Sequence, residues 1–203
     1  MATVQFWFDF ASTYSYLSAM RIRSVADACG VAVAWRPFLL GPIFGAQGWT
    51  TSPFRIYPAK GRNMWRDMER RAAKYGVAFR RPDLEDEAAF PRNSVLAARA
   101  GLIALEAPWG EAFCREVFTA QFARGADISD AATLNQISVA SGGPDRLTER
   151  AVAADNKDRL RKNVDEASRL GIYGAPSFTT GEELFWGDDR LEDALEWAAG
   201  HAG

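Results

Sequence analysis

A strand–helix–strand pattern at one end of the chain and a strand–strand–helix pattern at the other limit the possible folds more than any other feature. At the N-terminal end, residues 4–8 form a short aromatic run that is typical of a buried strand. Ser12 or Thr13 can cap the helix that follows, and Gly30 is a natural residue to end it. Residues 31–35 predict a second strand. This part of the chain therefore predicts a compact β-α-β unit.

The C-terminal pattern starts at a Gly-Ala-Pro turn, residues 174–176. Residues 177–180 and 184–186 predict a β-hairpin that is joined by a Gly-Glu turn. A final helix is expected to start at Asp188 or Asp189. Its buried face would consist of Leu191, Ala194, Leu195 and Ala198.

A block of helical sequence separates these two patterns. Residues 40–58 hold three of the nine prolines and three glycines, so we expect an irregular segment that covers a site. The helices expected after it span residues 62–75, 93–105, 110–122, 130–140 and 147–170. The order of elements predicts an α/β protein in which an inserted all-helical domain interrupts a thioredoxin-like fold. We expect residues 1–40 and 171–203 to form the thioredoxin-like domain and residues 41–170 to form the inserted one.

Composition excludes several classes of protein and of site. The net charge of −2 gives no reason to expect nucleic acid or an anionic membrane as a partner. No stretch reaches the ~18 apolar residues of a membrane span, and we identify no signal peptide, so we expect a cytoplasmic protein. The single histidine, His201, lies at a chain end, so neither a histidine-based catalytic site nor a metal site is expected. Cys29 and Cys114 are expected to be small apolar residues rather than nucleophiles or disulfide partners.

Four groups of residues together resemble a known family. They are Phe8-Asp9-Phe10-x-Ser12-x-Tyr14-Ser15-Tyr16-Leu17, Lys60…Asp67…Arg70, Gly174-Ala175-Pro176-Ser177 and Trp186-Gly187-Asp188-Asp189-Arg190-Leu191. In this order they are similar to 2-hydroxychromene-2-carboxylate isomerases and, more broadly, to kappa-class glutathione transferases and DsbA-like oxidoreductases. The resemblance implies a DsbA/kappa-class type of fold, glutathione as cofactor and a homodimer. It also implies reversible isomerisation of 2-hydroxychromene-2-carboxylate to trans-o-hydroxybenzylidenepyruvate, a step in the breakdown of naphthalene-like aromatic compounds.

Ser12 is the candidate catalytic residue, and it would also bind the cofactor. It stands where disulfide oxidoreductases of this fold carry their reactive cysteine, and Ser15 stands at the position of the second cysteine. A helix N-terminus carries partial positive charge and lowers the pKa of a nearby thiol, so it should do the same for the thiol of bound glutathione. The Ser12 hydroxyl would donate a hydrogen bond to that thiolate. The alternative is that Ser12 only caps its helix.

The C-terminal motifs supply the other candidate cofactor-binding residues. We expect the Ala175-Pro176 peptide bond to be cis, with the backbone of Ala175 free to pair with the cysteinyl backbone of glutathione. Trp186, Asp188 and Asp189 belong to the segment that binds the γ-glutamyl end of glutathione in the family. Carboxylates at a helix start are also favoured without any function. Trp186 can equally belong to the core.

A basic segment at residues 55–81 and a polar cluster at residues 90–94 supply the candidate substrate contacts. Lys60 is the preferred partner for a substrate carboxylate, and Arg92 and Asn93 are the next candidates. The alternative is that the basic residues form a solvated helix face. Related sequences often carry an asparagine ahead of the lysine helix. Here that region holds Thr51, Ser52 and Phe54, which leaves the ring system of the substrate open.

Three functions remain possible from the sequence. The leading hypothesis is a glutathione-dependent isomerase of a small aromatic carboxylate, and the alternative is a kappa-class-like transferase that conjugates glutathione to electrophiles. A thioredoxin-like binding module without catalysis is the third. A disulfide oxidoreductase is the weakest option, because Ser12 and Ser15 cannot form a disulfide.

Overall fold

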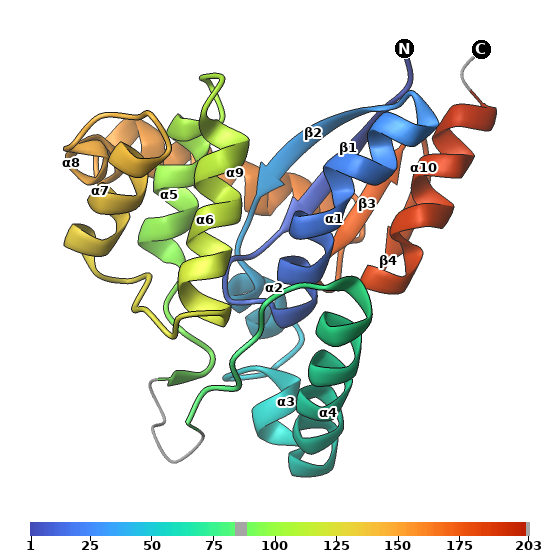
Figure 1. The fold of residues 1–203 in the computed structure, drawn as a ribbon, viewed down its shortest axis with the longest axis horizontal. Coiled ribbons are helices and arrows are strands. Elements are labelled where there is room, and N and C mark those ends of the chain that lie inside the picture. The colour runs from blue at the N-terminus through green and yellow to red at the C-terminus, as the bar shows by residue number, and fades with distance from the viewer. Residues whose placement is uncertain (84–88, 202–203) are drawn as a thin grey trace.

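The computed structural model describes residues 1–83 and 89–201 and has a four-stranded sheet at its centre (Figure 1). The strand order is β2-β1-β3-β4. β1 (Thr3–Phe8) pairs in parallel with β2 (Ala32–Pro37) and antiparallel with β3 (Ser177–Thr180). β4 (Glu183–Trp186) completes the hairpin with β3. This is the thioredoxin-like arrangement that the sequence predicts, with each strand within about one or two residues of its expected bounds.

Helices cover both faces of the sheet. Phe6 and Phe8 on β1 belong to the main core, against α1 (Thr13–Cys29) and α10 (Leu191–Gly200). Trp7 points to the opposite face and packs in a second cluster with residues of α9 (Ala154–Arg169). Because both faces of β1 are buried, its sequence is an unbroken apolar run rather than an alternating one.

The segment expected to be irregular contains two short helices, and this prediction was wrong. α2 spans Leu40–Ala46, α3 spans Pro53–Ile56, and α4 (Pro58–Tyr75) begins earlier than the expected residue 62. The three prolines of this segment lie in the first turns of these helices. Proline is tolerated there because the first N–H groups of a helix have no partner within the helix. The prolines therefore start helices here instead of preventing them.

The expected long helix at residues 147–170 is also wrong, because it is broken into α8 (Leu147–Ala151) and α9. The backbone of Ala153 is extended, with ψ of 150°. The buried Asn156 amide donates to the carbonyl oxygens of Ala151, at 3.1 Å, and of Arg99, at 3.0 Å. This side chain satisfies the end of α8 and ties the break to α5 (Val95–Ala104).

The remaining helices agree with the sequence to within a few residues. α6 spans Gly110–Phe122, and α7 spans Ala131–Ala140 with Asp130 as its cap. The final helix begins as the 3-10 turn η2 (Asp188–Arg190) and continues as α10, whose buried residues are those expected. No helix within the described ranges is long and apolar enough to cross a membrane. The domain boundaries at residues 40 and 171 stay a prediction.

Candidate functional site

A cavity of about 660 Å³ opens beside the N-terminal end of α1. Its wall combines the β1–α1 connection, α2 with the residues that follow it, the start of α4, residues 90–95, and residues 173–175 with Trp186. The two ends of the chain and the helical block therefore all contribute to one site. Of the residues expected from the sequence, those on its wall are Ser12, Lys60, Arg92, Asn93, Ala175 and Trp186.

Ser12 connects the β1–α1 segment to the Gly-Ala-Pro turn by a hydrogen bond. It is the N-cap of α1, where its Oγ accepts a hydrogen bond from the backbone N–H of Ser15 at 3.1 Å. The same Oγ donates to the carbonyl oxygen of Ala175 at 2.9 Å. The Ala175-Pro176 bond is cis, as expected. Ser12 is only 9% exposed, and its hydroxyl is held between the start of α1 and the Ala175 carbonyl.

Trp186 covers the Gly-Ala-Pro turn from the sheet edge. It is 50% exposed, and its ring centroid lies 5.0 Å from that of Tyr173. The indole lies so close over Gly174 that a Cβ there would be 2.2 Å from Nε1. Pro176 does not line the cavity, but its carbonyl oxygen accepts from the N–H of Gly187 at 3.0 Å. The glycine at 174 and this backbone bond together hold the tryptophan against the turn.

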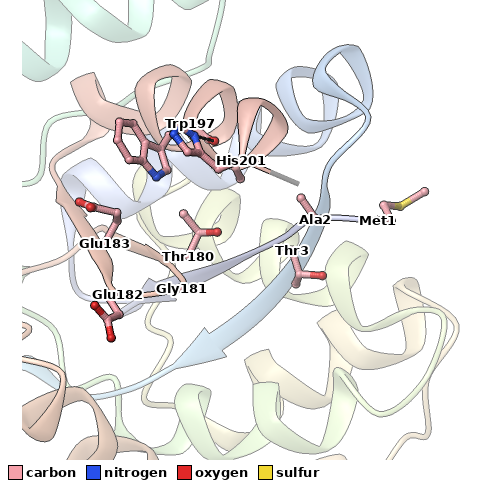
Figure 2. Close-up of a pocket in the computed structure, with 10 residues that line it drawn as sticks. Met1, Ala2, Thr3, Thr180, Gly181, Glu182, Glu183, Trp197 and His201 are labelled. Carbon is pink, nitrogen blue, oxygen red and sulfur yellow. Dashed lines mark hydrogen bonds between the residues drawn. The ribbon is translucent and has the colours of Figure 1, made fainter. Parts of the chain in front are cut away.

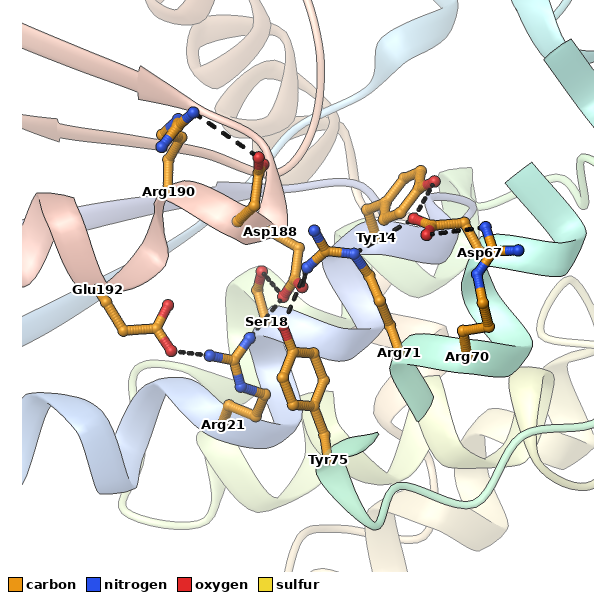
Figure 3. Close-up of polar contacts among 11 residues, drawn as sticks. Tyr14, Ser18, Arg21, Asp67, Arg70, Arg71, Tyr75, Asp188, Arg190 and Glu192 are labelled. Atoms are coloured by element: carbon orange, nitrogen blue, oxygen red, sulfur yellow. Dashed lines mark hydrogen bonds and ion pairs between the residues drawn. The ribbon is translucent and has the colours of Figure 1, made fainter. Parts of the chain in front are cut away.

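Asp188 lies in a buried ion-pair network rather than on the cavity wall (Figure 3). Its carboxylate accepts from Ser18 Oγ at 3.0 Å, from Arg21 at 3.1 Å and from Arg71 at 2.9 Å. Burial raises the pKa of Asp188, while the two guanidinium groups act in the opposite direction. Asp189 is about half exposed and also lies off the wall.

The network brings α1 and α4 to the start of α10, which the sequence did not reveal. Arg71 bridges Asp188 and Asp67, and Asp67 accepts from the hydroxyl of Tyr14 at 3.0 Å. Burial is the main reason that the pKa of Tyr14 is raised, with Asp67 adding to it. The only sequence feature that indicated arginine partners for these carboxylates was the excess of arginine in the basic segment.

The three residues expected to contact the substrate all line the cavity, but their side chains already contact different groups of the protein. The Lys60 ammonium lies 4.8 Å from the ring centroid of Tyr57 at the cavity edge. The Arg92 guanidinium donates to the carbonyl oxygen of Gly125 at 3.4 Å and lies 3.8 Å from a carboxylate oxygen of Asp127. The side-chain oxygen of Asn93 accepts from the N–H of Val95 at 3.0 Å, so it helps to start α5.

Aromatic rings form much of the remaining wall. Phe44 and Trp49 lie 5.6 Å apart between centroids, and Phe54 lies 6.4 Å from Tyr14. Thr51 and Ser52 also line this side, and Ser52 Oγ accepts from the N–H of Phe54 at 3.3 Å. This side of the cavity suits a flat apolar group.

Asp9 is a residue of this wall that sequence reasoning missed. It is 3% exposed, and its carboxylate accepts hydrogen bonds from Ala11 N, Leu40 N and Ser94 Oγ. Burial raises the pKa of Asp9, and these three donors lower it. A carboxylate inside an aromatic run is costly to bury, so its position in the sequence was itself a signal.

A second cavity lies at the other end of the sheet, between the start of β1, the β3–β4 turn and the end of α10 (Figure 2). The His201 ring stacks on Trp197 with centroids 4.0 Å apart, and its Nδ1 lies 2.8 Å from the Trp197 carbonyl oxygen. Within residues 1–83 and 89–201, no group of three or more His, Cys, Asp or Glu side chains could hold a metal. Both cysteines are free thiols, and Cys114 is fully buried.

Comparison with known proteins gives the family. The chain is 29% identical over 191 residues to a 2-hydroxychromene-2-carboxylate isomerase from Sphingobium xenophagum, which covers 94% of each chain. It is 26% identical to glutathione S-transferase kappa 2 from Caenorhabditis elegans, over 97% of this chain and 91% of that one. A solved structure of a 2-hydroxychromene-2-carboxylate isomerase shares the fold, with a TM-score of 0.83, 24% identity, and coverage of 98% of this chain and 95% of the other. The sequence profile of the DSBA-like thioredoxin domain matches residues 3–196, so the chain belongs to this family.

Proposed function

We propose that the protein is a glutathione-dependent isomerase that interconverts 2-hydroxychromene-2-carboxylate and trans-o-hydroxybenzylidenepyruvate. Relatives that carry the isomerase and transferase names support an enzyme, and their similarity extends along nearly the whole chain. The observation that carries the proposal is the contact of Ser12 with Ala175 at the N-terminus of α1, in a cavity that also exposes Lys60.

The residues around Ser12 fit glutathione. The cavity is roomy and partly apolar, and a peptide lying along residues 174–175 would find a backbone carbonyl to pair with. The Ser12 hydroxyl donates to the Ala175 carbonyl. A cysteinyl N–H that took over this carbonyl would release the Ser12 proton to point at a sulfur atom. The Ala175 carbonyl would then accept from the cysteinyl N–H, and the sulfur atom would accept from the Ser12 hydroxyl, so neither acceptor is left without a donor.

Bound glutathione would supply the thiolate that adds reversibly to the substrate, so that the former double bond can rotate. Ser12 and the N–H groups at the start of α1 would stabilise the charged sulfur. Ser12 does not act as a nucleophile in this scheme. The neighbouring Ser15 hydroxyl is buried and is not a wall residue, so it takes no part.

Different parts of the wall would hold the two molecules. On the side of the Gly-Ala-Pro turn, Trp186 would cover glutathione, and the exposed Asp189 is open to its ammonium group. Asp188 would contribute by holding the turn after Trp186, because its carboxylate already has three donors.

On the other side, the substrate carboxylate would lie near Lys60, with Arg92 and Asn93 next to it. The aromatic residues between α2 and α4 would pack against its rings. We further propose that the protein is a cytoplasmic homodimer, with this small aromatic carboxylate and no nucleic acid as its partner.

An absorbance time course tests the proposal directly. Purified protein is mixed with 2-hydroxychromene-2-carboxylate, with and without glutathione, and the formation of the benzylidenepyruvate is followed. Conversion that requires glutathione is the expected result. Equal conversion without glutathione, or no conversion by a protein that binds glutathione in calorimetry, would contradict it.

A kappa-class-like transferase is the second candidate, and the similarity to glutathione S-transferase kappa 2 favours it. A Lys60→Ala variant separates the two functions. Isomerisation of the carboxylate should fall sharply, whereas conjugation of glutathione to a neutral aryl halide should not change. Arg62→Ala is the matched control, because Arg62 is an exposed cation of the same helix that does not line the cavity.

A further inference from the structure

We propose that Asp9 is a positioning residue that fixes the spacing between the two sides of the cavity, a role that rests on the function proposed above. Its carboxylate binds three segments that are far apart in the sequence. One carries Ser12, one leads into α2, and one leads into α5. Movement of any one of them would change the gap between a thiol at Ser12 and a substrate on the opposite wall.

The two carboxylate oxygens serve different segments. Oδ1 accepts from the backbone N–H of Ala11 at 2.9 Å and from Ser94 Oγ at 2.6 Å. Oδ2 accepts from the backbone N–H of Leu40 at 2.8 Å. The backbone carbonyl of Asp9 also accepts from the N–H of Ser12 at 2.9 Å. Asp9 therefore contacts the Ser12 loop through both its side chain and its backbone.

Neither α2 nor α5 is capped by the side chain of its own N-cap residue, and Asp9 binds the start of both. Ser94 occupies the N-cap position of α5, where its side chain accepts no cap bond, and its hydroxyl donates to Asp9. α2 has no cap from its own N-cap residue, Leu39, and Asp9 supplies the acceptor. Asp9 therefore fixes both Leu40, the first residue of α2, and Ser94, which precedes α5.

Both segments held by Asp9 form the substrate side of the cavity. α2 contributes Leu40, Gly41 and Pro42, and residues 90–95 contribute Arg92 and Asn93. Asp9 lies on the cavity wall directly after β1, one of the two inner strands of the sheet. The Asp9 carboxylate therefore holds α2 and residues 90–95 at fixed positions relative to the sheet.

An asparagine at this position distinguishes the two oxygens. In Asp9→Asn the amide oxygen can still accept from Ala11 and Ser94, but the NH₂ group would face the N–H of Leu40. Two donors then face each other, and α2 loses its anchor. Ser94→Ala is the matched control, since it removes one donor and leaves both backbone N–H groups on the carboxylate.

Hydrogen–deuterium exchange of the ligand-free proteins tests the anchor without any substrate. In Asp9→Asn we expect exchange in residues 40–46 to rise at least about tenfold, the effect of one lost hydrogen bond to a charged carboxylate, with β1 and β3 unchanged. In Ser94→Ala we expect the rise only near the start of α5. Unchanged exchange in α2, or an equal rise throughout the sheet, would overturn the proposal.

Kinetics tests the consequence for the site. In Asp9→Asn the kcat/KM for the chromene carboxylate should fall about fivefold, while the dissociation constant for glutathione stays within about twofold. An equal loss of glutathione affinity would mean that Asp9 only stabilises the fold, and would refute the positioning role. If the wild-type protein proves inactive, the proposed function fails, and exchange in α2 still decides the role of Asp9.

Discussion

Replacing Ser12 by alanine should have two separable effects, one on stability and one on a bound thiol. Its Oγ accepts from Ser15 N and donates to the Ala175 carbonyl. Loss of an N-cap costs about 1 kcal/mol, and loss of a neutral hydrogen bond costs about as much again. For this chain of 203 residues, a fall of about 2 kcal/mol in the free energy of unfolding lowers Tm by about 4–8 °C.

The effect on glutathione follows from the charge on its sulfur. A hydrogen bond to a charged group contributes about 1.5–3 kcal/mol, and one pKa unit corresponds to about 1.4 kcal/mol. If the Ser12 hydroxyl donates to the thiolate, Ser12→Ala should therefore raise the pKa of the bound thiol by about 1–2 units. The ultraviolet absorbance of the thiolate, titrated against pH in the complex, measures this shift.

Ser15→Ala is the control for this experiment. Ser15 lies one turn into the same helix, and its buried Oγ has no hydrogen-bond partner among the described residues. Its removal should leave the pKa of the bound thiol unchanged and Tm equal or slightly higher. A bound thiol with the same pKa in Ser12→Ala as in Ser15→Ala would refute the role assigned to Ser12.

Three further predictions concern Asp188, Gly174 and Tyr16, whose hydroxyl donates to the carbonyl oxygen of Ala78. Asp188→Ala leaves two arginines without their shared buried carboxylate and should lower the free energy of unfolding by about 3 kcal/mol in urea titrations, against less than about 0.5 kcal/mol for the exposed Asp189→Ala. Gly174→Ala should push the Trp186 ring away, because the new Cβ would lie 2.2 Å from Nε1, and we expect altered tryptophan fluorescence with weaker glutathione binding. Burial raises the pKa of Tyr16 from 10.0 to about 12, so the unfolded chain ionises first as pH rises. Stability present below pH 10 is then lost toward pH 12, by up to about 3 kcal/mol in urea titrations, and a Tyr16→Phe variant should not show this loss.

Local signals predicted the sheet and failed for parts of the helical block. The aromatic run of β1 and the hairpin of β3 and β4 are specified by residues that adjoin one another, so both were predicted correctly. Proline has opposite effects in the first turn and in the interior of a helix, and sequence alone did not show which applied to Pro53 and Pro58. The break after α8 depends on Asn156, whose partner Arg99 is 57 residues away.

In the candidate site, too, residues in short motifs were predictable and contacts between distant segments were not. Ser12 and Ala175 belong to recognisable motifs, and the structure brings them into contact across 163 residues. The partners of Asp188 come from α1 and α4, and no spacing within a motif reveals that Arg21 and Arg71 converge on it. Residues were predictable where a short motif carries them, and unpredictable where burial recruits partners from separate helices.

The order of the strands has a consequence for synthesis on the ribosome. β1 is an inner strand of the sheet, but its neighbour β3 follows it only after the whole helical block. Until Ser177–Thr180 emerge, one edge of the aromatic strand Thr3–Phe8 has unpaired N–H and C=O groups. Unpaired strand edges promote aggregation. The nascent chain therefore carries its most apolar strand half-paired through most of translation, the stage at which it would depend most on a chaperone.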